Sequence, residues 1–232
     1  MHPSPRFHIE SREDMAALVR DLGFGILVAQ TEERLRAVHV PVLLQGDRLR
    51  FHVSRGNLVH AALAAGCEAL FVANGPHAYV SPADYGMDGR VPTWSYVSVE
   101  LNGPVRPLGT EALVRLLDDL SAVNEERLAP KPAWTRADVT PALFQGLLKS
   151  ISGFEMIVRD WRGTAKIDQD KPAEVRTRIA DALSRRGDRE MAALYASPSP
   201  DGEGDQAKLG GGVEGAGGNA PAPQRPQGGM GA

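Results

Sequence analysis

Hydrophobic and polar residues alternate with a period of two along much of the first half of the chain, a pattern typical of strands with one buried face. Between residues 48 and 54, Leu49, Phe51 and Val53 share one face, and the residues between them are polar or charged. Gly46-Asp47, just before this run, predicts a hairpin turn. Strands are predicted over residues 24–30, 34–45, 48–54, 67–73, 93–105 and 153–166.

Apolar residues at intervals of three and four predict helices elsewhere. The first begins after Ser11, a suitable N-cap, and ends at Gly23. Further helices are predicted over residues 57–65, 110–126, 136–149 and 172–194. Because long helices do not separate the strands one by one, a parallel Rossmann-type sheet is disfavoured. The pattern predicts a mainly β (α+β) fold, a small β-barrel with peripheral helices.

Composition changes near the C-terminus. Residues 197–232 hold 11 of the 25 glycines and 5 of the 17 prolines, and no aromatic residue. Such a segment cannot bury enough apolar surface to offset the entropy of ordering, so a folded domain over residues 1–196 and a disordered tail over residues 197–232 are expected. The net charge of −3 includes four acids and two bases in the tail, so the domain is nearly neutral. This balance argues against a dedicated nucleic-acid binder.

Several classes of site are disfavoured by the residue inventory. Cys67 is the only cysteine, which excludes an intrachain disulfide and a thiolate metal site. The six histidines lack metal-binding spacing, and no nucleophile–base motif is present, so no metal ligand and no catalytic residue is assigned. No apolar run reaches membrane-spanning length and no signal-peptide core is apparent, so a cytoplasmic protein without a membrane partner is expected.

The segments Gly75-Pro-His-Ala-Tyr-Val-Ser-Pro82 and Val91-Pro-Thr-Trp-Ser-Tyr96 concentrate aromatic rings and hydrogen-bonding groups. Their prolines are incompatible with a helix interior. The pair is therefore interpreted as a rigid, irregular wall suited to a planar polar ligand. The alternative is a tight connection between two strands, with the aromatic rings filling the space beneath it.

Three further groups of residues are candidates for ligand contacts. His39 lies in the apolar run 38–44 and is expected to be buried, bonded either to a ligand or to a backbone carbonyl. Ser54, Arg55 and Asn57 stand where a strand ends and a helix is predicted to begin, which suits a phosphate cradle but also an ordinary capped helix with an exposed arginine. Lys166 and Gln169 stand at the end of the last predicted strand, where they could meet a carbonyl-rich heterocycle or a phosphate, although such side chains are usually solvated.

Taken together, these segments resemble the PaiB family, the FMN-binding negative transcriptional regulators. The resemblance extends from Phe7 to about Leu194 and rests on separated motifs. They are Ala37-Val-His-Val-Pro41, Phe51-His-Val-Ser-Arg-Gly-Asn57, the two aromatic segments, Ile151-Ser-Gly-Phe-Glu155 and Lys166-Ile-Asp-Gln169.

The resemblance implies a split β-barrel related to the pyridoxine phosphate oxidase group. It also implies a homodimer with FMN between the two barrels, in contact with both subunits. By motif, the residues on the isoalloxazine side would be Val38, His39, Val40 and Pro41. Those facing the phosphate would be Ser54, Arg55 and Asn57. Those completing the pocket, from the partner chain, would be Trp94, Lys166 and Gln169.

The chain departs from the family pattern at Asp168 and Asp170, where the family has neutral polar residues. Negative charge there would weaken binding of a phosphate or a reduced flavin unless Lys166 offsets it. Three functions follow from these observations. They are an FMN-binding PaiB-type transcriptional regulator, a flavin-dependent oxidoreductase, and a degenerate barrel that serves as a dimeric binding scaffold. Direct contact with DNA is compatible with the first but is not supported by the charge.

Overall fold

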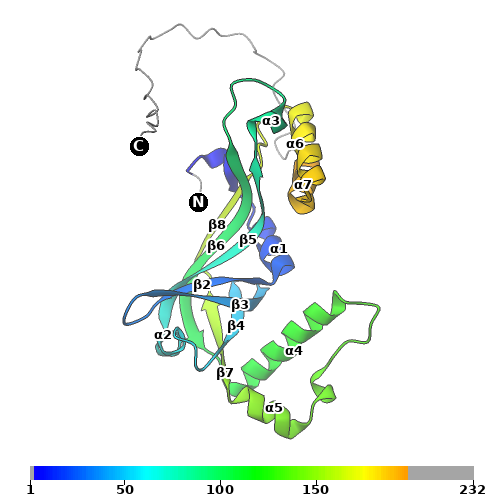
Figure 1. The fold of residues 1–232 in the computed structure, drawn as a ribbon. Helices are drawn as coiled ribbons and strands as arrows, with labels where there is room; N and C mark the ends of the chain where they lie inside the picture. Colours follow the sequence, from blue (N-terminus) through cyan, green and yellow to red (C-terminus); the bar gives the residue numbers. More distant parts are fainter. Residues whose placement is uncertain (1–2, 198–232) are drawn as a thin grey trace, which may run out of the picture. The chain divides into compact units, whose positions relative to one another are not determined.

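Eight antiparallel strands form one sheet in the computed structural model, which describes residues 3–197 (Figure 1). They run in the order β1-β8-β6-β5-β2-β3-β4-β7, and β7 also pairs with β6. The strands are β1 (His8–Ile9), β2 (Phe24–Gln30), β3 (Leu35–Gln45), β4 (Arg48–Ser54), β5 (Cys67–Val80), β6 (Thr93–Pro107), β7 (Ile151–Ile157) and β8 (Asp160–Lys166).

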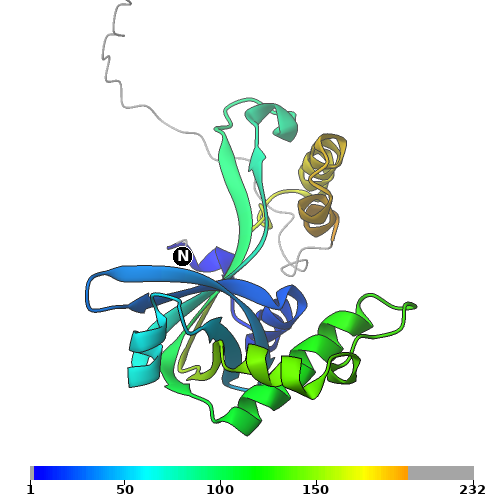
Figure 2. The same ribbon diagram turned by 60° about the horizontal axis from the view of Figure 1, so that its bottom comes forward.

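The additional β6–β7 pairing closes six of these strands into a barrel. Residues 105–107 of β6 pair with β7, and residues 96–102 pair with β8. The first half of β6, the second half of β5, β8 and β1 therefore form an extension that leaves the barrel (Figures 1 and 2). We call this part of the sheet the extension.

The strand predicted over residues 153–166 is wrong, because β7 and β8 are separate strands. The chain turns at Val158 and Arg159, whose amides donate to Asp47 and Asn102 at 2.8 Å each. Gly103 allows the crowded passage, since a Cβ at this position would lie 2.0 Å from the carbonyl oxygen of Ile157. The alternation breaks at this turn, where two polar residues, Arg159 and Asp160, follow each other and the apolar positions change phase; the prediction of a single strand did not use this signal.

The barrel interior is filled by the inward-facing residues of the alternating strands. Phe51, Phe71, Leu101 and Phe154 are fully buried there. Helix α1 (Arg12–Leu22) covers the next part of the sheet and buries Val19. It begins and ends as predicted: the Ser11 side chain accepts from the Asp14 amide at 3.1 Å, and Gly23 adopts a left-handed conformation.

The remaining helices lie around the barrel and the extension (Figures 1 and 2). They are η1 (Pro5–Phe7), α2 (His60–Ala65), α3 (Pro82–Tyr85), α4 (Thr110–Glu126), η2 (Arg136–Asp138), α5 (Pro141–Leu148), α6 (Ala173–Arg186) and α7 (Arg189–Ala196). The single helix predicted over residues 172–194 is wrong, because Gly187 (φ 92°) ends α6 and α7 starts two residues later. The helix predicted over 136–149 is shorter, since Val139 and Thr140 are extended.

The segment expected to be an irregular wall is instead the end of β5. It pairs with β6 through a β-bulge between Asn74 and His77, so the segment is itself a strand, neither an irregular wall nor a tight connection between two strands. As expected, residues 75–80 are not helical; α3 begins at Pro82. No helix within residues 3–197 is long and apolar enough to cross a membrane. The predicted tail lies outside the described residues, apart from Ser197.

Candidate functional site

One face of the sheet, which we call the outer face, exposes apolar residues on β2 and β3. Phe24 is 52% exposed and Leu35 is 65% exposed. His39 pairs with Ile26 across the two strands, and its ring stacks on Phe24 with centroids 6.0 Å apart. His39 is therefore exposed, and the expectation of a buried imidazole is wrong. Strand alternation shows that two faces differ, but it cannot say which of them is covered.

The same strand divides the four residues that the resemblance assigned to the isoalloxazine. His39 and Pro41 belong to the outer face, whereas Val40 is buried inside the barrel and Val38 packs against the core. Because successive residues of a strand alternate, only backbone atoms of Val38 and Val40 could contact a ligand on the outer face. The β3–β4 ladder ends at the Val42–Phe51 pair, and no ladder joins residues 38–41 to β4 among the strands described.

The outer face continues along the extension as a row of aromatic side chains. The bulge in β5 places His77 and Tyr79 opposite Tyr96 and Trp94. The Trp94 ring is 57% exposed and lies 6.1 Å from the His77 ring and 6.2 Å from the Tyr79 ring. We call His77, Tyr79 and Trp94 the aromatic row. The rings are inclined to one another, and an exposed ring such as that of Trp94 can stack on a planar heterocycle.

Lys166 is bound to the strand that carries this row. Its Nζ donates to the Trp94 carbonyl oxygen at 2.7 Å and also contacts Thr93 Oγ1. Partial burial lowers the pKa of Lys166, and the negative charge of Asp168 opposes that shift. The ammonium group thus holds the backbone of Trp94 in place.

Gln169 has a different role from the one expected. Its Nε2 donates to the carbonyl oxygens of Arg6 (2.9 Å) and Ala165 (2.8 Å), and its Oε1 accepts from the Ile167 amide at 3.2 Å. These bonds shape the turn after β8. Gln169 therefore lies near Lys166 in the chain, but its amide is directed to the protein backbone.

Asp168 is the centre of a buried network that the sequence did not reveal. Its carboxylate accepts from Tyr195 Oη at 2.7 Å and from Tyr85 Oη at 3.0 Å, and Tyr195 Oη also lies 2.6 Å from Ser95 Oγ. Burial, followed by the charge of Asp168, raises the pKa of both tyrosines. The two tyrosines are far apart in sequence, so no local pattern could have indicated the contact.

Asp170 is also engaged within the chain. Its carboxylate lies 3.0 Å from Arg6 and 2.8 Å from Lys171. Burial alone would raise the pKa of Asp170, but the hydrogen bond and charge of Lys171, with the charge of Arg6, lower it overall. Asp170 is therefore compensated by two cations, whereas Asp168 keeps its negative charge because its partners are neutral phenols. That Asp168 weakens flavin binding stays a prediction.

Ser54, Arg55 and Asn57 lie together in the exposed turn after β4. The Arg55 Nε donates to the Ile151 carbonyl oxygen at 3.1 Å, and Ser54 Oγ accepts from the Gly56 amide at 3.3 Å. Asn57 Oδ1 accepts from the Val59 amide at 3.1 Å, and α2 starts only at His60. The helix start predicted at residue 57 is thus three residues too early, and an anion would meet the turn and its guanidinium.

A closed six-stranded ring that opens into an extension defines a split β-barrel. The FAD and heme binding protein from Mycobacterium smegmatis shares this fold, with a TM-score of 0.51 and 20% identity over 68% of this chain and 73% of that one. A conserved hypothetical protein from Mycobacterium tuberculosis has a TM-score of 0.53 and 11% sequence identity, over 74% of this chain and 94% of that one. At these identities the likeness concerns the fold alone.

The sequence comparison gives the family. Residues 1–160 match the family described as "Putative FMN-binding domain", and the chain belongs to that family. A relative from Bacillus subtilis (strain 168), Protease synthase and sporulation protein PAI 2, is 26% identical over 169 residues, which is 71% of this chain and 80% of the relative. The PaiB-family resemblance and the split-barrel fold are confirmed, and FMN, the implied cofactor, is the one in the family's description.

Proposed function

We propose that the protein is a PaiB-type regulator that works as an FMN-binding homodimer. In the dimer, the outer face of one chain packs on the outer face of a second. The support is the set of uncovered apolar residues on β2 and β3, with Leu35 and Phe24 more than half exposed. Exposed apolar side chains on one face of a sheet mark a candidate protein interface.

A dimer also explains why the candidate flavin contacts are far apart in one chain. Trp94 is near the start of β6, whereas the Arg55 turn follows β4 beside β7, which pairs with the end of β6. From Trp94 to Pro107, β6 is about 43 Å long at ~3.3 Å per residue. One FMN molecule cannot bridge that length. In a twofold dimer, the turn of one chain can face the aromatic row of the other.

We infer that Ser54, Arg55 and Asn57 hold the phosphate of FMN and that His39 and Pro41 flank its ring system. Trp94, with Lys166 behind it, would cover the ring from the partner chain, while Gln169 keeps the turn after β8 in shape. When bound, FMN supplies the electron-transfer chemistry, and these residues bind and orient it. A guanidinium beside a hydroxyl suits a phosphate, and an exposed indole suits a flat ring.

The first test is the visible absorption spectrum of the full-length protein after FMN is added and the excess removed. The wild type should keep a flavin spectrum. Arg55→Ala should lose at least about tenfold in FMN affinity, since a charge-assisted hydrogen bond contributes about 1.5–3 kcal/mol. Arg115→Ala, on the exposed side of α4, is the matched control. A colourless wild type would refute the proposal.

The second test asks whether each site uses two chains. Arg55→Ala and Trp94→Ala are expected to bind FMN poorly when each is purified alone. Mixed and reassembled, they should recover about a quarter of the sites, because half of the dimers are mixed and each has one intact site. A mixture that recovers nothing, while both variants stay dimeric, would contradict a shared site.

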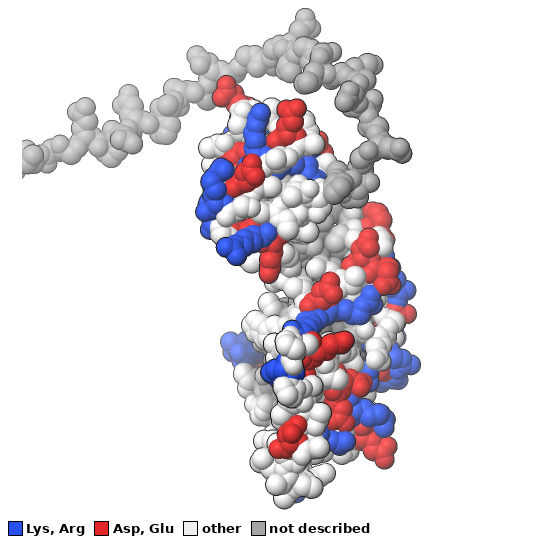
Figure 3. Space-filling model, turned by 90° about the vertical axis from the view of Figure 1, so that its right-hand side faces the viewer, with Lys and Arg blue, Asp and Glu red and all other residues white. Residues whose placement is uncertain are grey.

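We propose that regulation acts in the cytoplasm, through a protein partner whose binding depends on FMN occupancy. Figure 3 shows Lys and Arg interleaved with Asp and Glu on the face that carries α6 and α7. Arg186 on α6, for example, is paired with Asp84 at 2.9 Å. A gel shift of upstream DNA that weakens steeply with salt would favour direct DNA contact instead.

A further inference from the structure

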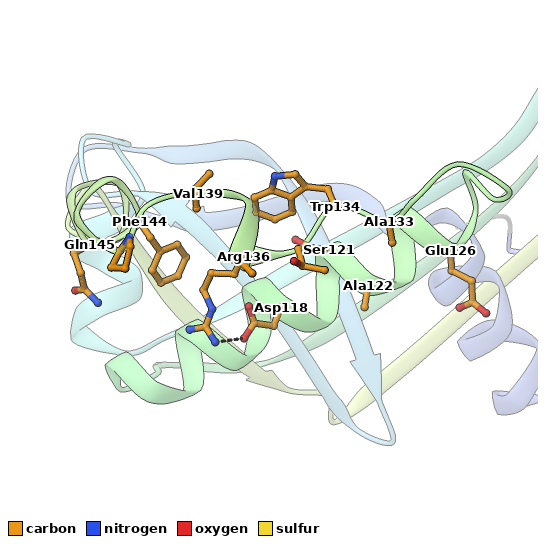
Figure 4. A pocket seen from close by; sticks show the side chains of 13 residues that line it. Asp118, Ser121, Ala122, Glu126, Ala133, Trp134, Arg136, Val139, Phe144 and Gln145 are labelled. Atoms are coloured by element: carbon orange, nitrogen blue, oxygen red, sulfur yellow. Dashed lines mark ion pairs between the residues drawn. The ribbon is translucent and has the colours of Figure 1, made fainter.

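A cavity of about 800 Å³ lies away from the proposed flavin site (Figure 4). One wall is α4, and the other is the connecting segment after residue 132 together with α5. None of Arg55, His39, Trp94 and Lys166 lines it. Its volume is within the range of small-molecule sites in proteins.

The cavity exists because small and large residues face it from opposite walls. Helix α4 contributes Ser121 and Ala122, whereas the other wall contributes Trp134 and Phe144. The backbone next to Trp134 is fixed, since its amide donates to the Glu125 carboxylate at 3.0 Å. The capping box at Thr135 fixes the next turn. The indole is therefore held beside open space, and 42% of its surface is exposed.

The charges that line the cavity leave an excess of one negative charge. Arg136 is directed to Asp118, with a nitrogen–oxygen distance of 3.2 Å (Figure 4). Its guanidinium also lies 5.3 Å from the centre of the Phe144 ring. The positive charge of Arg136 is thus compensated. Glu126 also lines the cavity and has no ion pair among residues 3–197.

We propose that this cavity binds a small organic cation that carries an apolar ring, an arylalkylamine in chemical class. The ring would pack between Trp134 and the small residues of α4. The ammonium group would approach Glu126 and gain from the electron-rich face of the indole. A carboxylate ligand is disfavoured, because Arg136 is already paired and Glu126 would repel it.

Three probes that share a phenyl ring but differ in charge test the proposed ligand class: 2-phenylethylamine, 2-phenylethanol and phenylacetate. The full-length protein labelled with 5-fluorotryptophan contains three tryptophans and gives three ¹⁹F resonances. The amine should shift the Trp134 resonance saturably, with an affinity about fivefold above that of the alcohol. Phenylacetate should be the weakest ligand. An unmoved Trp134 resonance, or equal affinity for amine and phenylacetate, would overturn the proposal.

Variants separate the charge from the ring. Glu126→Gln should reduce the affinity for the amine about fivefold, to the level of the alcohol. The affinity for the alcohol itself should not change. Glu111→Gln, on the same helix but outside the cavity, is the matched control and should stay within about twofold of the wild type. Trp134→Ala should weaken binding of both the amine and the alcohol. Trp94→Ala should change neither affinity. Amine affinity that survives Glu126→Gln unchanged would contradict the role of that carboxylate.

Discussion

Replacing Tyr195 by phenylalanine tests the buried network around Asp168. Tyr195 is 1% exposed, and its hydroxyl bonds Ser95 at 2.6 Å and Asp168 at 2.7 Å. The substitution keeps the ring and removes only the oxygen, so packing should change little. It leaves the fully buried Ser95 hydroxyl without this partner and takes one of two phenol donors from Asp168.

The size of the loss follows from these two groups. A buried polar group left without its partner costs about 1–3 kcal/mol. Asp168 keeps the hydrogen bond from Tyr85 at 3.0 Å, so its contribution to the loss lies at the lower end of this range. We therefore expect Tyr195→Phe to lower the free energy of unfolding by about 2–4 kcal/mol. Adding Ser95→Ala should recover part of that loss, because both partners are then apolar.

Urea unfolding followed by circular dichroism at pH 7 measures this loss in the full-length protein. Tyr79→Phe is the control, since Tyr79 is 46% exposed and the same atom is removed from the surface. The control should stay within about 0.5 kcal/mol of the wild type. Equal free energies for the Tyr195 and Tyr79 variants would refute the view that the network stabilises the fold.

Other predictions concern pH, a close contact and a buried carboxylate. Burial and then the neighbouring carboxylate raise the pKa of Tyr195 in the folded state. Its contribution to the free energy of unfolding is therefore present below about pH 10 and is lost as the pH rises above it, because the unfolded state deprotonates first. Because the pKa of Tyr85 is raised in the same way, the free energy of unfolding should fall by up to about 1.4 kcal/mol per pH unit for each of the two tyrosines. A flat profile between pH 10 and 11.5 would contradict this. Gly103→Ala should prevent folding, as its Cβ would meet Ile157, whereas Gly109→Ala, in open space, should give a normal circular dichroism spectrum. Glu155→Gln should lower the free energy of unfolding in urea by about 1–2 kcal/mol. Glu155 is 5% exposed and its carboxylate lies 2.7 Å from Arg48 and 2.9 Å from Arg106. An unchanged urea midpoint would exclude a stabilising role for this carboxylate.

Local patterns predicted the elements whose ends carry a marker. Helix α1 has both a capping Ser11 and a closing Gly23, and its bounds were predicted within one residue. The turn between β7 and β8 has no glycine or proline, and its only signal is the change of phase in the alternation at Arg159 and Asp160. Gly187-Asp188 did carry a signal, a helix-ending glycine followed by a suitable N-cap, that was not used.

The site was less accessible from the sequence than the fold. The motifs identified the turn at Arg55 and the exposed Trp94, but they treated residues 38–41 as one surface, which strand alternation does not allow. They also placed Asp168 near the cofactor as a charge that would weaken its binding, but gave no sign that its hydrogen-bond partners come from α3 and α7. Such contacts depend on the packing of distant segments, and no periodicity within one segment encodes them.

The bulge in β5 has a consequence for changes in chain length. It accommodates one residue more than β6 offers, and it bends the strand where the extension leaves the barrel. Deleting Pro76 would restore a regular ladder and leave His77 and Tyr79 on their present face. A homologue or designed variant one residue shorter here would therefore keep the same aromatic row but point it in another direction, so a single deletion could change how two subunits fit together without altering any contact residue.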